Sequence, residues 1–383
     1  MALAIKLAKQ GQYTTSPNPR VGCVLVANAA DHSAEKTKII GAGFHQKAGQ
    51  GHAEVNALAD AKLNNPTLIK GATAYVTLEP CSHFGRTPPC AQALIDAGIK
   101  HVIAAMVDPN PEVSGRGLAM LERAGIKAES GLLENEAKAL NIGFIKLMTQ
   151  ALPYVRIKLA ASLDGKTAMK NGESKWITSP EARKDVQRLR ARSCGIISGA
   201  DSILTDNAKM TVRWSELGEL QQSYQKEDIR QPVRVVIDSQ NRLTPELDFF
   251  KIDSPILIIS TLKDQPLENL PKWPHFVEQV QLPTIKNNVG EDKVNLTKLL
   301  MMLAKRGLNE VLVESGANLA GAFIEQGLAD ELILYQAPKL MGGDGKNLLE
   351  MPNITALAQA KSLAITDVRL VGCDIRITAS LKN

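Results

Sequence analysis

His52-Ala53-Glu54 opens a stretch that closes with Glu79-Pro80-Cys81-Ser82-His83-Phe84-Gly85-Arg86-Thr87-Pro88-Pro89-Cys90. One imidazole and two thiols can hold a zinc ion through three protein ligands, which leaves the fourth position for a water molecule. Zinc lowers the pKa of such a water toward neutrality. Glu54 lies two residues after His52, where its carboxylate can move protons for that water. We therefore predict zinc ligands at His52, Cys81 and Cys90, with Glu54 as a catalytic acid and base.

Two other interpretations compete with a catalytic zinc site: a structural zinc site, or a pair of free thiols. Structural zinc sites are usually closed by four protein ligands. The glutamate two residues after His52 and the Glu-Pro-Cys turn favour an open, catalytic site.

The pattern H-x-E followed by P-C and a second cysteine is typical of zinc-dependent deaminases of nucleobases. In the common pattern two residues separate the cysteines, whereas eight separate Cys81 from Cys90. The insert is polar, basic and rich in turn residues. We predict that it is a substrate loop, with His83 and Arg86 as candidate substrate contacts.

The patterns around the stretch predict an α/β domain. A helix over 53–63 would begin next to His52, a strand over 72–78 would deliver Cys81, and a helix over 88–97 would begin near Cys90. Further elements are predicted at 1–10, 21–26, 39–44, 101–107, 115–124 and 126–129. The charged segment 31–38 is predicted to be an exposed hairpin region. We place the end of this first domain at residue 145.

Composition limits the remaining possibilities. A chain of 383 residues with 44% apolar residues predicts two or three globular domains. The net charge of +5 and the aromatic content of 4% argue against nucleic acid as a partner. No apolar run is long enough for a membrane span. Five cysteines, two of them assigned to a metal, predict a reducing, cytoplasmic location, and Cys23, Cys194 and Cys373 are predicted to be core thiols.

The first domain resembles a known family. Ser16-Pro17-Asn18-Pro19-Arg20-Val21-Gly22, together with the long insert between the cysteines, is similar to the deaminase half of the bifunctional riboflavin-biosynthesis enzymes. The resemblance implies a cytidine-deaminase-like α/β/α fold. It also makes Asn18 and His45 candidate substrate contacts, against the simpler interpretations of an Asn-Pro turn and a loop histidine.

The second half, residues 146–383, alternates strand and helix patterns, which predicts an α/β domain with a mostly parallel sheet. The predicted strands are 195–199, 233–238, 256–260, 310–314 and 331–336, and residues 154–166 are predicted to form a strand followed by a polar turn. The predicted helices are 181–192 and 294–305, and residues 315–322 are predicted to lead into a helix that ends at 326. Residues 263–293 are predicted to be irregular. The dinucleotide fingerprint G-x-G-x-x-G is absent from the sequence. Two glycine-bearing turns, 199–205 and 316–322, suit a phosphate, although packing alone also explains such glycines.

This half resembles the reductase half of the same family. The similar segments are Lys158-Leu159-Ala160-Ala161-Ser162-Leu163-Asp164-Gly165, Gly172-Glu173-Ser174-Lys175-Trp176-Ile177-Thr178, Thr211-Val212-Arg213 and Val313-Glu314-Ser315-Gly316. The resemblance implies a dihydrofolate-reductase-like fold that uses NADPH. The implied NADPH contacts are Ala160, Trp176, Ser202, Asp206, Ser239, Gly316, Ala317, Asn318, Leu319, Ala320, Gly321 and Ala322. The implied substrate contacts are Ser174, Arg190, Met210, Arg213 and Glu314.

An arginine side chain suits the phosphate of such a substrate, because its guanidinium group forms charge-assisted hydrogen bonds with phosphate oxygens. We predict this role for Arg190 and Arg213; without the resemblance, each would be read as a solvated charge. Lys158 is a candidate to polarise or protonate the sugar carbonyl oxygen, and Asp206 competes for that role.

The zinc motif predicts a zinc enzyme, and the resemblance implies that it is bifunctional and uses NADPH as a second cofactor. The resemblance implies deamination of 2,5-diamino-6-(5-phosphoribosylamino)pyrimidin-4(3H)-one, followed by reduction of the ribosyl chain, and a homo-oligomer. One alternative is a nucleoside or tRNA-base deaminase with an accessory α/β domain. Another is a non-enzymatic binding module with a structural zinc.

Overall fold

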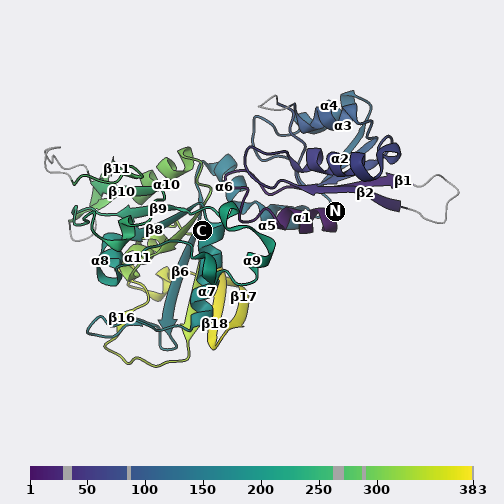
Figure 1. Ribbon diagram of the computed structural model, residues 1–383. Helices are drawn as coiled ribbons and strands as arrows, with labels where there is room; N and C mark the ends of the chain where they lie inside the picture. Colours follow the sequence, from purple (N-terminus) through teal and green to yellow (C-terminus); the bar gives the residue numbers. More distant parts are fainter. Residues whose placement is uncertain (29–36, 84–87, 262–270, 287–289, 382–383) are drawn as a thin grey trace. The chain divides into compact units, whose positions relative to one another are not determined.

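The computed structural model describes residues 1–28, 37–83, 88–261, 271–286 and 290–381, and the chain divides into two compact units between Ala151 and Leu152 (Figure 1). This division falls a few residues after the predicted domain end at 145. Helix α6 (Ile142–Gln150) runs through the predicted position and ends next to the observed one. Of the predicted hairpin region, residues 31–36 lie outside the described residues. No helix among the described residues is both long and apolar enough to cross a bilayer.

Unit 1 contains a five-stranded sheet with the order β2-β1-β3-β4-β5. The predicted elements are confirmed, and α5, which had not been predicted, follows them. Strand β1 pairs antiparallel with β2 and β3, whereas β3, β4 and β5 are parallel. The elements are α1 (Ala2–Lys9), β1 (Gly22–Asn28), β2 (Thr37–Phe44), α2 (Ala53–Asn64), β3 (Thr73–Val76), α3 (Cys90–Asp96), β4 (His101–Ala104), α4 (Arg116–Arg123), β5 (Lys127–Ser130), α5 (Glu134–Leu140) and α6.

Two glycines place helices on opposite faces of this sheet. A Cβ at Gly22 would lie 2.0 Å from the carbonyl oxygen of Ala4 in α1, and a Cβ at Gly43 would lie 2.5 Å from the backbone nitrogen of Ala57 in α2. Gly22 is the cross-strand partner of Phe44, so it shares a face with Phe44, and its neighbour Gly43 points to the other face. Helices α1 and α2 therefore cover opposite faces, which is the predicted α/β/α arrangement.

Unit 2 is built on a nine-stranded sheet with the order β11-β10-β9-β8-β14-β6-β15-β18-β17 (Figure 1). The strands from β11 to β15 in that order are parallel, as predicted, and β18 and β17 are antiparallel additions. The strands of the nine-stranded sheet are β6 (Tyr154–Ser162), β8 (Gly195–Gly199), β9 (Val233–Ile237), β10 (Ile256–Thr261), β11 (Val277–Leu282), β14 (Glu310–Glu314), β15 (Glu331–Ala337), β17 (Leu363–Val371) and β18 (Asp374–Leu381). Strands β7 (Lys166–Ala168) and β16 (Lys346–Asn347) form one two-stranded sheet, and β12 (Thr284–Lys286) and β13 (Asp292–Val294) form another. The helices are α7 (Pro180–Arg192), α8 (Ala200–Asp206), α9 (Leu220–Ser223), α10 (Leu296–Lys305) and α11 (Ala317–Glu325).

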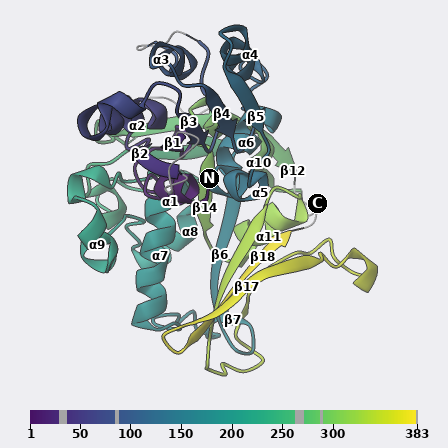
Figure 2. The same ribbon diagram turned by 90° about the vertical axis from the view of Figure 1, so that its right-hand side faces the viewer.

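Three sequence predictions for unit 2 need correction. The region 263–293, predicted to be irregular, contains β11, β12 and β13. Strands β17 and β18, which run side by side in Figure 2, were not predicted. Cys23 and Cys194 are buried as predicted, but Cys373 lies in the turn between β17 and β18 and is exposed.

Candidate functional site

The three predicted zinc ligands come together in unit 1. His52 caps the N-terminus of α2, Cys81 follows β3, and Cys90 is the first residue of α3. The Nδ1 atom of His52 lies 3.2 Å from Sγ of Cys90 and 3.6 Å from Sγ of Cys81. Tetrahedral zinc with ordinary Zn–N and Zn–S bonds separates its ligand atoms by about 3.5 Å. The donor set and its spacing therefore fit zinc, and among the described residues this is the only such group of three or more ligands.

The electrostatics of the cluster favour a thiolate. Hydrogen bonds from the Cys90 thiol and from His52 lower the pKa of Cys81 to about 4, against the effect of burial. The hydrogen bond between His52 and Cys81 also raises the pKa of His52. The backbone N–H of Cys90 also donates to Sγ of Cys81, at 3.3 Å. Cys81 is therefore prepared as the anionic ligand that zinc requires.

Glu54 lies in the first turn of α2 and is almost completely buried, with 3% of its surface exposed. Burial raises its pKa to about 7, and the negative charge of Cys81 contributes in the same direction. A carboxyl group that titrates near neutrality can both accept and donate a proton at physiological pH. The geometry supports the acid–base role predicted for Glu54.

Asn18 and His45 lie beside the metal cluster. The Nδ2 atom of Asn18 lies 3.1 Å from Nε2 of His45, whose Nδ1 atom donates to the carbonyl oxygen of Gly51 at 3.1 Å. The ring of His45 packs edge-on against the ring of His52, with 5.4 Å between centroids. The two residues therefore form one polar group at the metal site, as expected for pocket residues; their contact with substrate stays a prediction.

The insert between the cysteines is described only in part. His83 is exposed, and Arg86 lies outside the described residues. Asp108, which was not predicted as a site residue, lies close enough to both Cys81 and His83 to interact with them electrostatically, and burial raises its pKa. Its side chain also accepts a hydrogen bond from the backbone N–H of Asn110 at 2.8 Å.

The sequence analysis missed Glu79, which is buried next to the metal ligands and holds the loop that faces them. Its Oε2 atom accepts hydrogen bonds from the backbone N–H groups of Asp108 and Gly115, and its Oε1 atom accepts from those of Gly117 and Leu118, at 2.8–3.3 Å. Residues 108–118 are thereby fixed against the Glu-Pro-Cys turn. The only sequence signal for this role was a glutamate directly before Pro80-Cys81.

Replacing Glu79 with Gln is expected to destabilise unit 1 by about 3 kcal/mol, because either orientation of the amide places an NH₂ group against two backbone donors. Chemical denaturation followed by a unit 1 probe measures this change. Glu112→Gln, at an exposed position of the same loop, is the matched control. Equal stability of the two variants would contradict the anchoring role.

In unit 2, predicted cofactor residues follow the carboxyl ends of neighbouring strands, and we call this side of the sheet its carboxyl edge. Strands β8, β9 and β14 are parallel, and their carboxyl ends lead into Ser202, Ser239 and Gly316, respectively. Ligands of open α/β sheets bind outside the carboxyl ends of the strands. This edge is therefore the candidate NADPH site, and each individual contact stays a prediction.

The predicted cofactor turn 316–322 is not uniformly open. Gly316 and Asn318 are exposed, whereas Ala320 is completely buried in the core. A Cβ at Gly321 would lie 2.0 Å from the carbonyl oxygen of Glu350, so this glycine allows a close backbone approach. The start of the turn, rather than its second half, presents groups to a ligand.

Three predicted substrate residues meet beside this edge. Arg190 of α7 forms two hydrogen bonds with the Glu314 carboxylate, Nε to Oε1 at 2.6 Å and Nη2 to Oε2 at 2.9 Å, and its Nη2 atom lies 3.7 Å from the sulfur of Met210. The guanidinium lowers the pKa of Glu314, although burial opposes it. The fork of Arg190 is thus paired with Glu314, and the contact of Arg190 with a substrate phosphate stays a prediction.

Lys158 of β6 is the cross-strand partner of Glu314. Burial lowers the pKa of Lys158, Glu314 opposes this change, and Arg190 reinforces it. Asp206, the competing candidate, is 41% exposed at its side chain and lies 3.8 Å from the Lys175 ammonium. Lys158 thus lies beside two charged side chains, Glu314 and Arg190, whereas Asp206 is partly exposed.

The Arg213 side chain is exposed to solvent. It is 46% exposed and pairs with Glu216, Nε to Oε1 at 2.6 Å and Nη2 to Oε2 at 2.8 Å. Exposed ion pairs contribute little to stability, so a phosphate can take the place of Glu216. Trp176 is also exposed, with the Arg183 guanidinium 4.5 Å from its ring centre, while Ser174 and Ala160 are partly buried.

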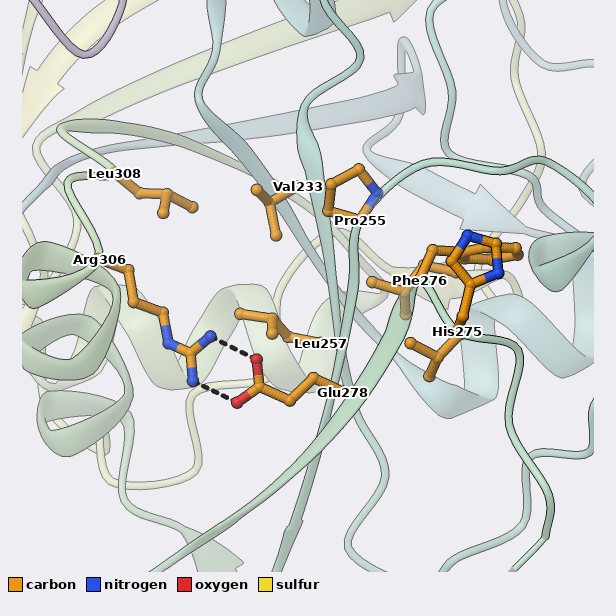
Figure 3. A pocket seen from close by; sticks show the side chains of 10 residues that line it. Val233, Pro255, Leu257, His275, Phe276, Glu278, Arg306 and Leu308 are labelled. Carbon is orange, nitrogen blue, oxygen red and sulfur yellow. Dashed lines mark hydrogen bonds and ion pairs between the residues drawn. The ribbon is translucent and has the colours of Figure 1, made fainter.

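A groove of about 400 Å³ lies on the side of this sheet away from the carboxyl edge, at the amino ends of β9, β10 and β11 (Figure 3). Val233, Leu257 and Leu308 line it, and Arg306 forms two hydrogen bonds with Glu278 across it. It holds none of the predicted site residues.

Comparisons with known proteins match both units. Residues 1–106 match the family model "Cytidine and deoxycytidylate deaminase zinc-binding region", and residues 153–376 match "RibD C-terminal domain". The chain is 49% identical to the riboflavin biosynthesis protein RibD of Haemophilus influenzae, with 100% of this chain and 96% of that protein covered, and 48% identical to RibD of Escherichia coli, with 98% and 96% covered. A solved structure of Acinetobacter baumannii RibD is 41% identical with a TM-score of 0.86, covering 100% of this chain and 98% of that one. A Thermotoga maritima diaminohydroxyphosphoribosylaminopyrimidine deaminase/5-amino-6-(5-phosphoribosylamino)uracil reductase is 31% identical with a TM-score of 0.82, covering 100% and 97%.

Proposed function

This chain belongs to the RibD family of bifunctional deaminases and reductases of riboflavin biosynthesis, and from that membership we propose which substrates and residues its two units use. Unit 1 deaminates 2,5-diamino-6-(5-phosphoribosylamino)pyrimidin-4(3H)-one. Unit 2 then reduces the ribosyl chain of the product, 5-amino-6-(5-phosphoribosylamino)uracil, to a ribityl chain, in line with the activities in the name of the Thermotoga maritima relative. The observation that carries the deaminase assignment is the cluster of His52, Cys81 and Cys90 with buried Glu54 beside it.

His52, Cys81 and Cys90 would hold the zinc. Zinc, when bound, supplies a Lewis acid that makes water nucleophilic near neutral pH. The Glu54 carboxylate accepts a proton from the attacking water and delivers it to the amino nitrogen that leaves as ammonia. Burial of Glu54 excludes bulk water from this transfer. Asn18 and His45, joined by their hydrogen bond, orient the pyrimidine ring.

The carboxyl edge of the unit 2 sheet would hold NADPH, which supplies the hydride for the reduction. Lys158 donates a proton to the ring oxygen of the ribosyl group, which becomes a hydroxyl as the ring opens and leaves C1′ double-bonded to the amino nitrogen. Acceptance of hydride at C1′ then gives the CH₂ group of the ribityl chain. The Arg190–Glu314 pair fixes the charge next to Lys158. Arg213 binds the substrate phosphate at the exposed side of the site.

Replacing Arg213 with Ala is expected to raise the KM of the reductase for its phosphorylated substrate about 10- to 100-fold, because charge-assisted hydrogen bonds to the phosphate are lost. The deaminase rate stays unchanged. Steady-state kinetics of both reactions measure the effect. Arg306→Ala removes an arginine with the same kind of exposed bidentate partner, Glu278, and serves as the control. A KM equal to that of the unmodified protein would contradict the phosphate role.

Product analysis by mass spectrometry tests the whole proposal. The zinc-loaded chain receives the diaminopyrimidine substrate with and without NADPH. Replacement of an amino group by oxygen is expected in both samples, and addition of two hydrogens only with NADPH. Neither change in zinc-replete protein would overturn the assignment and direct attention to nucleosides and RNA bases.

A homo-oligomer that acts in the cytoplasm, with no nucleic acid or membrane partner, completes the proposal. Strand β17 at the edge of the sheet exposes Leu363, Ile365, Val368 and Leu370, between 43% and 74% of each. Exposed apolar edge strands favour pairing with another chain. None of the five cysteines forms a disulfide, which supports a reducing compartment. Analytical ultracentrifugation measures the oligomeric state, and a monomer at micromolar concentration would contradict this part.

A further inference from the structure

The segment 209–213 of unit 2 carries two predicted substrate residues, Met210 and Arg213, but belongs to no helix or strand. Met210 has a φ of +51°, in the left-handed region that residues other than glycine rarely adopt. Thr211 and Val212 are buried, with 3% and 6% of their surfaces exposed. Their backbone polar groups therefore need partners within the protein.

Side chains from two separate elements supply these partners. The amide of Gln231 forms two hydrogen bonds with one residue: its Oε1 atom accepts from the backbone N–H of Val212 at 2.8 Å, and its Nε2 atom donates to the carbonyl oxygen of Val212 at 2.9 Å. This exchange reproduces what a neighbouring strand does in an antiparallel pair. Both backbone polar groups of Val212 are thereby paired, as they would be in a strand, although no strand lies there.

Helix α7 holds the residues on either side of Val212. The Oε1 atom of Gln187 accepts from the backbone N–H of Arg213 at 2.9 Å, and the Nη1 atom of Arg190 donates to the carbonyl oxygen of Thr211 at 3.0 Å. Gln187 and Arg190 are three residues apart, so they lie on the same face of α7. Gln187 is 1% exposed, so its side chain is fixed by packing.

Both glutamines sit on rigid supports. Gln231 lies two residues before β9, and the intervening Pro232 restricts its backbone. We propose that Gln231 and Gln187 are positioning residues of the reductase: they fix the backbone of Val212 and Arg213, and thereby direct the Arg213 guanidinium toward the substrate phosphate. The proposal rests on the phosphate-binding role proposed above for Arg213.

Kinetics of the full chain on the phosphorylated reductase substrate and on its dephosphorylated counterpart test the proposal. Gln231→Met removes both hydrogen bonds to Val212 and is expected to raise the KM for the phosphorylated substrate about tenfold. The kcat, the affinity for NADPH, the deaminase rate and the kinetics of the dephosphorylated substrate stay unchanged. Gln187→Met is expected to act in the same direction. Gln222→Met, at an exposed position of α9, is the control.

A second variant covers the case in which Gln231→Met does not fold. Gln231→Glu keeps an acceptor for the N–H of Val212 but places its other oxygen against the carbonyl oxygen of Val212, so the same rise in KM is expected. With Arg213 already replaced by Ala, none of the glutamine variants should raise KM further, because positioning acts through Arg213.

Three results would overturn the positioning role: an unchanged KM in a folded Gln231 variant, equal losses on both substrates, or losses that add to those of Arg213→Ala. The two proposals can be told apart. If Arg213→Ala raises KM and the glutamine variants do not, only the positioning role is wrong. If Arg213→Ala leaves KM unchanged, both the phosphate role and the positioning role are wrong.

Discussion

Replacing Glu54 with Gln is expected to lower the kcat of the deaminase about 10³-fold, because the variant loses the group that accepts and returns the proton. Zinc stays bound, since His52, Cys81 and Cys90 are unchanged. Gln has nearly the same shape as Glu, and it removes a buried carboxyl group whose pKa burial had raised to about 7. The fold is therefore preserved. Ammonia release and metal content by mass spectrometry measure the two effects separately.

Glu122→Gln in α4 is the matched control, because Glu122 is an exposed glutamate in the same unit. The reductase rate of Glu54→Gln on the deaminated substrate serves as an internal standard, since unit 2 is untouched. Full ammonia release by Glu54→Gln would contradict the proton-transfer role. Loss of zinc from the variant would show instead that Glu54 supports the ligands.

Replacing Lys158 with Met is expected to lower the kcat of the reductase about 100-fold or more while the deaminase rate stays unchanged, because general-acid assistance to the developing alcohol is lost. Asp206→Asn is expected to have a much smaller effect, since Asp206 is partly exposed and pairs with Lys175. Single-turnover measurement of NADPH oxidation reports the chemical step. Lys184→Met, at an exposed position of α7, is the control. The opposite ranking of Lys158 and Asp206 would assign the role to Asp206.

The reductase rate of the unmodified protein should also depend on pH in a defined direction. Lys158 acts as an acid only in its protonated form. Burial lowers its pKa in the folded protein. The rate should therefore fall as pH rises through a value below about 10.4, the ordinary pKa of lysine. This alkaline limb is absent from the residual activity of Lys158→Met if Lys158 is its source.

The metal site could be predicted from sequence because short motifs around each ligand identify it. The spacing of His52 and Glu54 and the turn before Cys81 specify both the ligand types and the helix that presents them. The same reasoning did not reveal the pairing of Arg190. Its partner Glu314 lies 124 residues away in the chain, and only the folded sheet places that carboxylate against α7. Glu79 escaped notice for a similar reason, since its role depends on backbone groups that have no sequence signature.

Two of the missed strands, β11 and β17, are the edge strands of the nine-stranded sheet; β18 lies next to β17, and β12 and β13 form a separate two-stranded sheet. Strand β11 follows a proline-rich stretch and mixes apolar and polar residues without strict alternation, and β17 is exposed along most of its length. Central strands such as β10, which is buried at every position, form continuous apolar runs that a sequence pattern reveals. Edge strands lack that pattern, so their own sequences do not reveal them; they form strands because they pair with a neighbouring strand of the sheet.

The pairing of β6 has a consequence for how the chain is made. This strand begins unit 2, yet its neighbours in the sheet, β14 and β15, begin at Glu310 and Glu331. None of its sheet hydrogen bonds can form until the ribosome has passed residue 310, whereas the strands of unit 1 all lie within the first 130 residues. Pairings this distant in sequence are slow because the loop between them must close first. We therefore expect unit 1 to fold during synthesis, and the reductase half to remain exposed to aggregation until the last strands emerge.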